Sequence, residues 1–289
     1  MIYNYIRGGI RKAYLASVVS KGEDGMNSKK AVFFDIDGTL YLAGKPPIPS
    51  AAEAIRKIRE NGHLAFVCTG RSKALIPETP ILDMGFDGIV GACGAYGECG
   101  GKELFRESLG KEQLEDLIQT FRRYKIMYIL EGTEYIYYDE ETAEGMEEDW
   151  YLRYVMETMG DRFISVQKAE NIDACKASIN AKDSDPTELY ESLGAHFEIM
   201  KHVFGVAEFV PKGYTKAKGI ELVCKELGIH RKDTIAVGDS INDVDMLQYA
   251  GIGICMGNGS EPAKACADYI TSDLFDDGIY RAMDHFGLI

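Results

Sequence analysis

A short apolar run that ends in two carboxylates constrains this chain more than any other feature. Residues 31–34 are all apolar, and the motif Asp-Ile-Asp-Gly-Thr-Leu follows directly at positions 35–40. A fully apolar run of this length is typical of a strand buried on both faces of a parallel sheet. Such sheets place their ligands at the carboxyl ends of their strands, where Asp35 and Asp37 stand. Gly38 would let the chain turn tightly after them.

Two carboxylates separated by one residue are a weak signal by themselves. The chain has further pairs at Asp183/Asp185 and Asp243/Asp245, which is about what composition predicts. The Gly-Thr-Leu continuation lowers the chance of a random match by roughly three orders of magnitude. The alternative is an Asx-turn that only ends the strand.

A second polar motif follows another apolar strand candidate near the C-terminus. Residues 234–237 read Thr-Ile-Ala-Val and lead into Gly238 and Asp239. Asp239, Asn242 and Asp243 offer three oxygen-bearing side chains within five residues, which suits a hard cation such as Mg²⁺. The alternative is a helix N-terminus with acidic residues in its first turn.

Convergence of the two motifs would favour a bound cation. Two carboxylates about 4 Å apart repel each other by about 4 kcal/mol at an effective dielectric constant near 20. A site formed by Asp35, Asp37, Asp239 and Asp243 is therefore hard to explain without a metal. The sequence predicts Mg²⁺ at this site.

Two weaker signals stand at the ends of other core elements. Residues 63–68 are predicted to form a second buried strand, which ends at Thr69 and Gly70, and Lys216 opens a predicted helix. Alone, a Thr hydroxyl more often caps a turn and a Lys more often lies on a solvated face. Because both residues stand at the ends of core elements, we interpret Thr69, Gly70 and Lys216 as phosphate contacts.

The order of predicted elements indicates an α/β fold with an insertion. Strands at 31–34 and 63–68 flank a helix from about Ser50, which forms a capping-box pattern with Glu53. Similar elements return near the C-terminus, with helices at 216–227 and 243–250 and strands at 234–237 and 251–256. Strand, helix and strand at this spacing indicate a doubly wound, Rossmann-like parallel sheet.

The middle of the chain has a different pattern. It suggests an amphipathic helix at 109–124, paired strands at 127–130 and 134–138, and strands at 175–181 and 196–202. We therefore predict a core formed by residues 30–89 and 209–289, an inserted α+β cap at 90–208 and an N-terminal extension at 1–29. We interpret the many tyrosines of the insertion as cap core. Gly91, Gly94 and Gly97, near the first crossing, are expected to give a lid its backbone freedom.

Composition excludes several classes of partner. The formal charge is 32 − 46 = −14, which disfavours nucleic acid and anionic membranes. No apolar stretch approaches the ~20 residues of a membrane span. Seven scattered cysteines without a C-x-x-C pair indicate reduced thiols in a cytoplasmic protein.

These elements, in this order, closely resemble the haloacid dehalogenase superfamily. The resemblance covers residues 30–289, strongly in the core and only in outline across the insertion, which looks like a type IIB cap of the Cof-type branch. By that resemblance, Asp35 would be the nucleophile and Asp37 the general acid/base. Thr69, Gly70 and Lys216 would bind the phosphoryl group.

The resemblance also implies the metal ligands. Asp239 would bind Mg²⁺ together with Asp35 and the backbone carbonyl of Asp37. Asn242 and Asp243 would position the metal's waters, the phosphate-binding lysine or the phosphate itself, so that Asn242 is a phosphate-site residue and Asp243 a metal-site residue.

Two positions depart from the family pattern. The usual Asn-Gly-Ala at the first hinge is Cys-Gly-Ala here, starting at Cys93, which removes an amide. The usual Lys-Gly is Lys216-Ala217, with Lys218-Gly219 two residues on. Lys218 therefore remains an alternative phosphate ligand.

The predicted function is Mg²⁺-dependent hydrolysis of a small phosphorylated metabolite, such as a sugar phosphate, through an aspartyl-phosphate. Alternatives within the superfamily are a phosphomutase or phosphotransferase, a dehalogenase, and a catalytically silent phospho-ligand binding module. A signalling receiver domain is a further alternative, which the Gly-Thr continuation and the large insertion disfavour. The sequence predicts neither a particular substrate nor an oligomeric state.

Overall fold

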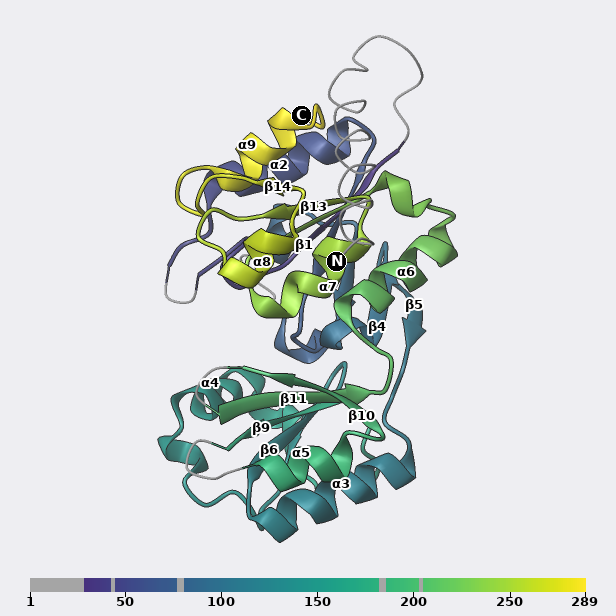
Figure 1. The fold of residues 1–289 in the computed structure, drawn as a ribbon. Coiled ribbons are helices and arrows are strands. Elements are labelled where there is room, and N and C mark those ends of the chain that lie inside the picture. The colour runs from purple at the N-terminus through teal and green to yellow at the C-terminus, as the bar shows by residue number, and fades with distance from the viewer. Residues whose placement is uncertain (1–28, 43–44, 77–80, 182–185, 203–204) are drawn as a thin grey trace. The chain divides into compact units, whose positions relative to one another are not determined.

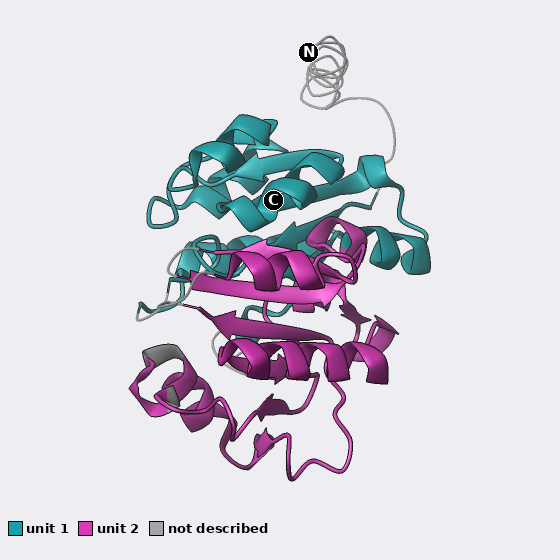
Figure 2. Cartoon of the chain, turned by 60° about the horizontal axis from the view of Figure 1, so that its bottom comes forward, with its two compact units in different colours: residues 1–68, 78–89, 220–289 teal, residues 69–77, 90–219 magenta. Residues whose placement is uncertain are grey.

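The chain forms two compact units, which Figure 2 colours separately. The computed structural model describes residues 29–42, 45–76, 81–181, 186–202 and 205–289. The first unit comprises residues 1–68, 78–89 and 220–289, and the second comprises residues 69–77 and 90–219. Of the predicted N-terminal extension, residues 1–28 lie outside the described residues. The first unit is thus assembled from segments that lie far apart in the sequence.

The sheet of the first unit is parallel, as predicted. Its strands are, in spatial order, β14 (Tyr269–Ile270), β13 (Ile252–Cys255), β12 (Thr234–Gly238), β1 (Ala31–Phe34) and β2 (Leu64–Cys68). The first two residues of β3 (Gly88–Gly91) also belong to this unit. In the register of β1, Phe34 lies between Val237 of β12 and Val67 of β2. All four residues of β1 are buried.

Helices cover both faces of this sheet. Figure 1 shows α2 (Pro49–Glu60) and α9 (Gly278–His285) on one face, and α7 (Val244–Tyr249) and α8 (Glu261–Cys266) on the other. The chain moves in opposite directions from β1 to β2 and from β12 to β13. Right-handed crossovers therefore place the connecting helices on opposite faces. This is the predicted doubly wound arrangement.

The start of α2 corrects the predicted capping box. The helix begins at Pro49, and no side chain caps it. Proline suits the first helical position because it needs no N–H partner there and its φ is already helical. Ser50 is therefore inside the helix and cannot act as its cap. Among the described residues its hydroxyl has no hydrogen-bond partner.

The second unit contains a six-stranded sheet. In spatial order its strands are β10 (Phe197–Lys201), β11 (Val206–Pro211), β9 (Lys176–Asn180), β6 (Met127–Glu131), β7 (Ile136–Tyr138) and β8 (Phe163–Ser165). Neighbours are antiparallel except β7 and β8. The antiparallel pairing of β6 with β7 confirms the predicted strand pair. The unit also contains an antiparallel hairpin of β4 (Tyr96–Cys99) and β5 (Lys102–Arg106).

Helices and short turns complete the fold. Those of the second unit are α3 (Lys111–Tyr124), α4 (Trp150–Met159), α5 (Thr187–Leu193), η1 (Lys73–Leu75), η3 (Ala92–Gly94), η4 (Met146–Glu148) and η5 (Gly160–Arg162). The first unit has η2 (Leu82–Met84), η7 (Arg231–Asp233) and η8 (Ile241–Asp243). α6 (Lys216–Leu227) begins in the second unit, and its residues from Ile220 onward belong to the first.

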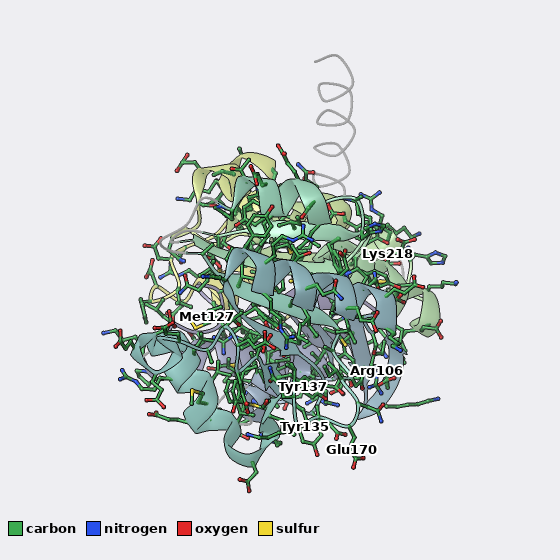
Figure 3. All side chains as sticks on the ribbon, turned by 90° about the horizontal axis from the view of Figure 1, so that it is seen from below. Arg106, Met127, Tyr135, Tyr137, Glu170 and Lys218 are labelled. Atoms are coloured by element: carbon green, nitrogen blue, oxygen red, sulfur yellow. The ribbon has the colours of Figure 1, made fainter. Side chains whose placement is uncertain are left out.

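Aromatic residues fill the core of the second unit. Phe121 of α3 packs edge-on against Phe209 of β11, with ring centroids 5.3 Å apart. Tyr128 and Tyr137 belong to the same buried cluster, which supports the core interpretation for these two, whereas Tyr154 is 45% exposed. Tyr135, labelled beside Tyr137 in Figure 3, is 38% exposed, and its ring centroid is 6.3 Å from that of Tyr137.

The C-terminal edge of the predicted cap falls inside a strand. The prediction ends the insertion between residues 208 and 209, but β11 runs without interruption from Val206 to Pro211. Residues 209–219 also belong to the second unit. The function of this unit as a cap stays a prediction.

A buried carboxylate joins several elements of the second unit. Asp139, directly after β7, is fully buried. It accepts hydrogen bonds from Arg122 (2.7 and 3.2 Å), Tyr128 (2.7 Å), Gln167 (2.5 Å) and the Glu141 amide (3.0 Å). Burial by itself would raise the pKa of Asp139, but these donors lower it to about 2.

We expect Asp139→Asn to lower the free energy of unfolding by about 2 kcal/mol at pH 7. Because the pKa of Asp139 is depressed in the folded state, the ionised carboxylate makes its full contribution to stability above the unfolded pKa near 4. This contribution to stability is lost as the pH falls towards 2. Denaturant titrations of both proteins at pH 7 and pH 3 should show the difference narrowing at pH 3. Equal stability at pH 7 would contradict the assignment.

Candidate active site

Three of the four carboxylates that the two acidic motifs were predicted to bring together lie close to one another in the first unit. Asp35 directly follows β1, Asp239 follows β12, and Asp243 ends the turn η8. One carboxylate oxygen of each lies within 4.8 Å of the others. Asp35 and Asp243 are buried, and Asp239 is half-buried. The parallel pairing of β1 with β12 brings the first two together, because the Asp35 amide donates to Val237 O (2.9 Å).

Two glycines let these carboxylates approach the backbone closely. Gly38 has φ +91°, and a Cβ there would collide with the Asp239 carboxylate. A Cβ at Gly238 would lie 2.6 Å from the Asp243 carboxyl carbon. Gly38 therefore provides the tight turn that was predicted, and both positions exclude larger residues.

Hydrogen bonds fix the loop that carries Asp239. One oxygen of Asp243 accepts from the backbone amides of Asp239 and Ser240, each at 2.9 Å. The Ser240 hydroxyl also donates to the amide oxygen of Asn242. Asp243 thus holds the loop in shape besides lying in the acidic group, and Asn242 is tied to the same turn.

Asp37 lies differently from the other acidic residues. It is exposed, and its side chain is not part of the acidic group found among the described residues. Its backbone forms an isolated bridge with Tyr41. This geometry is compatible with the expected split of roles, in which the Asp37 carboxylate handles protons and only its carbonyl faces a metal.

The acidic group fits a divalent cation. Each pair of carboxylates at such separations repels by about 4 kcal/mol at an effective dielectric constant near 20, and burial strengthens the repulsion. Oxygen ligands of this type are those that Mg²⁺ prefers. Asp35, Asp239 and Asp243 are therefore the side chains that would surround the ion.

Three of the predicted phosphate contacts, Thr69, Gly70 and Lys216, belong to the second unit, whereas Asn242 belongs to the first. Thr69 directly follows β2 in the chain and is buried. Its backbone amide donates to Val90 O (2.9 Å), and its carbonyl accepts from the Cys93 amide (3.2 Å). Its hydroxyl accepts from the Arg71 amide (3.2 Å). Thr69 and Gly70 are therefore held in a fixed turn, called the phosphate loop below after the role predicted for it.

The two candidate lysines lie in different environments. Lys216, the first residue of α6, is 2% exposed, whereas Lys218 is half-buried. The Lys218 amide donates to the Thr215 hydroxyl (3.2 Å), so Thr215 caps the helix just before Lys216. Burial and then Glu208 raise the pKa of the Cys93 thiol, and the charge of Lys216 offsets only part of this effect. Because Cys93 contacts Gly70 O, this proximity favours Lys216, and the choice between the two lysines stays a prediction.

Cys93, which departs from the family pattern, lies against the phosphate loop. It has φ 52° and ψ 33°, a left-handed conformation that asparagine adopts more readily than cysteine. Its thiol contacts Gly70 O (3.6 Å) and Glu208 (3.5 Å). Burial and then Glu208 raise its pKa well above the usual range, so the thiol is protonated and unreactive at neutral pH.

The glycines near the first crossing have a packing role. Gly94 has φ +93°, and a Cβ there would collide with Thr215 O, just before α6. A Cβ at Gly97 would collide with the Phe105 ring. Close approach of neighbouring segments therefore gives glycine a packing role at both positions, and the expected hinge freedom stays a prediction.

Comparison with protein-family models identifies the family of this chain. Residues 32–283 match the model of the haloacid dehalogenase-like hydrolases. The chain belongs to the haloacid dehalogenase-like hydrolases. The match covers both acidic motifs and the whole insertion, so the family predicted from sequence is confirmed.

Several relatives that match this haloacid dehalogenase-like hydrolase along most of its length are named phosphatases. The phosphatase YitU of Bacillus subtilis, named for 5-amino-6-(5-phospho-D-ribitylamino)uracil, is 25% identical over 88% of this chain and 96% of its own. A phosphoglycolate phosphatase of Methanobrevibacter smithii is 26% identical over 89% and 98%. These relatives confirm the prediction of a phosphatase-type hydrolase. Their named substrates differ from each other.

Solved structures agree with this assignment. A sugar phosphatase of subclass IIB of the superfamily matches with a TM-score of 0.74 and 29% identity, over 90% of this chain and 100% of its own. A Geobacillus kaustophilus protein matches with a TM-score of 0.77 and 26% identity, over 91% and 100%.

Two residues near the acidic group were not predicted from the sequence to be functional. The Thr39 hydroxyl donates to Asp239 (2.9 Å), which orients that carboxylate. Asn258 donates to Gly38 O (2.8 Å) and accepts from the Leu274 amide (2.8 Å). Both were visible as parts of longer motifs, but their partners are 200 and 220 positions away.

Over the described residues, no helix combines the length and the apolar character needed to cross a membrane.

Proposed function

We propose that this hydrolase cleaves small phosphomonoesters with the help of Mg²⁺, through an aspartyl-phosphate on Asp35. The observation that supports the proposal most directly is the position of Asp35. Its carboxylate follows a buried parallel strand and lies within 4.8 Å of Asp239 and Asp243. A carboxylate nucleophile can share a site with two other carboxylates when a bound cation neutralises their charges.

In the proposed reaction, Asp35 is the nucleophile and Asp37 transfers protons. A carboxylate oxygen of Asp35 forms a bond to phosphorus while the bond from phosphorus to the leaving oxygen breaks, and Asp37 gives that oxygen a proton. In the second step Asp37 takes a proton from water, whose oxygen attacks phosphorus and releases Asp35. The exposure of Asp37 supports this role, because the group must exchange protons with alcohol and water.

The phosphoryl group carries two negative charges that the chain must offset. We assign this task to the Thr69 hydroxyl, the Gly70 backbone and the Lys216 ammonium, with Asn242 near the acidic group. When bound, Mg²⁺ would add charge neutralisation at the phosphate oxygens.

The substrate class is proposed as a small phosphorylated metabolite, with sugar phosphates as the first to test. The 29% identity to a sugar phosphatase over 90% of the chain supports this order of testing. We also propose a cytoplasmic location. None of the seven cysteines, all within the described residues, forms a disulfide bond, which supports a reducing compartment.

We expect phosphatase activity to require Mg²⁺ and to disappear with a strong chelator. Activity should return when Mg²⁺ is added in excess. Ca²⁺ should inhibit, because its longer bonds and larger coordination number misplace the nucleophile. The measurement is the initial rate on p-nitrophenyl phosphate and on a panel of phosphorylated metabolites. Full activity in the chelator would exclude a metal-dependent reaction.

A further inference from the structure

A buried group of charged residues lies in the sheet of the second unit. Lys176 of β9 and Glu131 of β6 are directly opposite each other, and both are 1% exposed. Glu208 of β11 lies opposite Ser178, which shares a face of β9 with Lys176 because side chains alternate along a strand. Three neighbouring strands thus bring two carboxylates and one ammonium group to one face of the sheet.

The Lys176 ammonium has three partners. It donates to Glu208, lies 3.3 Å from an oxygen of Glu131, and donates to the backbone carbonyl of Gly70 at 3.0 Å. Burial lowers the pKa of Lys176, but Glu131 and Glu208 outweigh it and raise the pKa well above its usual value. Lys176 is therefore a buried cation with two hydrogen bonds and a close ion pair.

The bond to Gly70 fixes the phosphate loop. The peptide unit that joins Gly70 to Arg71 is planar, so the direction of the Gly70 carbonyl also sets that of the Arg71 amide. The Arg71 amide donates to the Thr69 hydroxyl at 3.2 Å. Because the oxygen of the Thr69 hydroxyl accepts this hydrogen bond, its own O–H points away from the Arg71 amide. Lys176 is therefore connected to Thr69 through a single peptide plane.

Close packing supports the same connection. A Cβ on Gly70 would lie 3.3 Å from a Glu208 oxygen and 3.4 Å from the Cys93 sulfur. Glu208 also pairs with His202 at 2.7 Å. The phosphate loop thus lies against the charged group, and the bond from Lys176 to the Gly70 carbonyl joins the two.

Stability alone is a weak reason to bury these charges. Removing an ion pair from water costs several kcal/mol per ion, and apolar residues of similar volume often stabilise a protein equally well. In this group two carboxylates face one lysine, and among the described residues the second oxygen of Glu131 has no hydrogen-bond partner. The hydrogen bond from Lys176 to the Gly70 carbonyl therefore points to a functional reason for burying these charges.

We propose that Lys176 is a positioning residue for phosphate binding, which acts through the Gly70 carbonyl to hold the Thr69 hydroxyl and the Gly70 backbone in their binding orientation. Glu131 and Glu208 keep its ammonium in place. The inference rests on the proposed function, since it assumes that the phosphate loop binds the phosphoryl group.

The test compares Lys176→Met with Arg122→Met, both in the full-length protein. Each substitution removes a cation from a buried carboxylate of the second unit, but Arg122 pairs with Asp139 and Glu141. Three quantities are measured in the presence of Mg²⁺. They are the inhibition constant of inorganic phosphate, KM for an aryl phosphate and KM for an alkyl phosphate. We expect Lys176→Met to raise all three by about tenfold, the size of one charge-assisted hydrogen bond. Arg122→Met should leave them within about twofold.

Several outcomes separate the possible explanations. Unchanged phosphate inhibition in folded Lys176→Met overturns the proposal, and so does a loss confined to one leaving group, which would mean substrate contact. If Lys176→Met fails to fold, the variant K176M/E131Q/E208Q carries no unpaired buried charge and gives the same test. Failure of the wild type to bind phosphate or to hydrolyse any phosphomonoester would contradict the proposed function itself.

Discussion

Asp35→Asn should abolish turnover while the protein stays folded. The amide has nearly the same shape as the carboxylate but does not attack phosphorus, so the first step cannot begin. The substitution also removes one of three mutually repelling carboxylates, so without metal the variant should be at least as stable as the wild type. Initial rates with Mg²⁺ and denaturant titrations measure the two effects.

Asp276→Asn is a suitable control for this variant. Asp276 lies in the same unit, and its side chain is 65% exposed and paired with Arg281. Its substitution should leave the rate nearly unchanged. If Asp35→Asn kept even a tenth of the wild-type rate, another residue would have to be the nucleophile.

Asp37→Asn should slow the reaction by about 10²–10⁴-fold for alkyl phosphates, whose leaving oxygen needs a proton. An activated aryl phosphate such as p-nitrophenyl phosphate has a leaving group that hardly needs protonation. Its first step should therefore be much less affected. The second step still lacks its base, so the variant should release a burst of nitrophenol and then stall.

Rapid mixing separates the two steps for this variant. The amplitude of the burst reports how much Asp35 becomes phosphorylated, and the later slope reports hydrolysis. Equal losses for the aryl and alkyl phosphates in the first step would show that Asp37 does not protonate the leaving group.

Much of the core could be predicted because its signals are local. Asp35 follows its own strand directly, and the same holds for Asp239. Parallel strands bring their carboxyl ends to one edge, so the convergence of these residues follows from the order of elements. The capping box at Ser50 failed for a local reason too, since Pro49 takes the first helical position.

The charged group under the phosphate loop was not predictable in this way. Glu131, Lys176 and Glu208 lie on strands that are neighbours in space but not in sequence, because β9 lies between β6 and β11. Antiparallel register is set by side-chain packing and turns, which the sequence does not reveal over such distances. A charged residue in a short strand otherwise looks like an exposed position. Only the register shows that these three share a buried face.

The pairing of β1 with β12 has a consequence for how the chain folds. Ala31 lies opposite Thr234, a separation of 234 − 31 = 203 residues, so the centre of the parallel sheet depends on contacts that close a very long loop. Such contacts form slowly, because the entropy of closing the loop is lost before the strands pair. During synthesis β1 has only β2 as a partner until residue 234 emerges, whereas residues 90–219 are continuous. The second unit can thus reach its native structure first, and the acidic residues meet only when about the last fifth of the chain has been made.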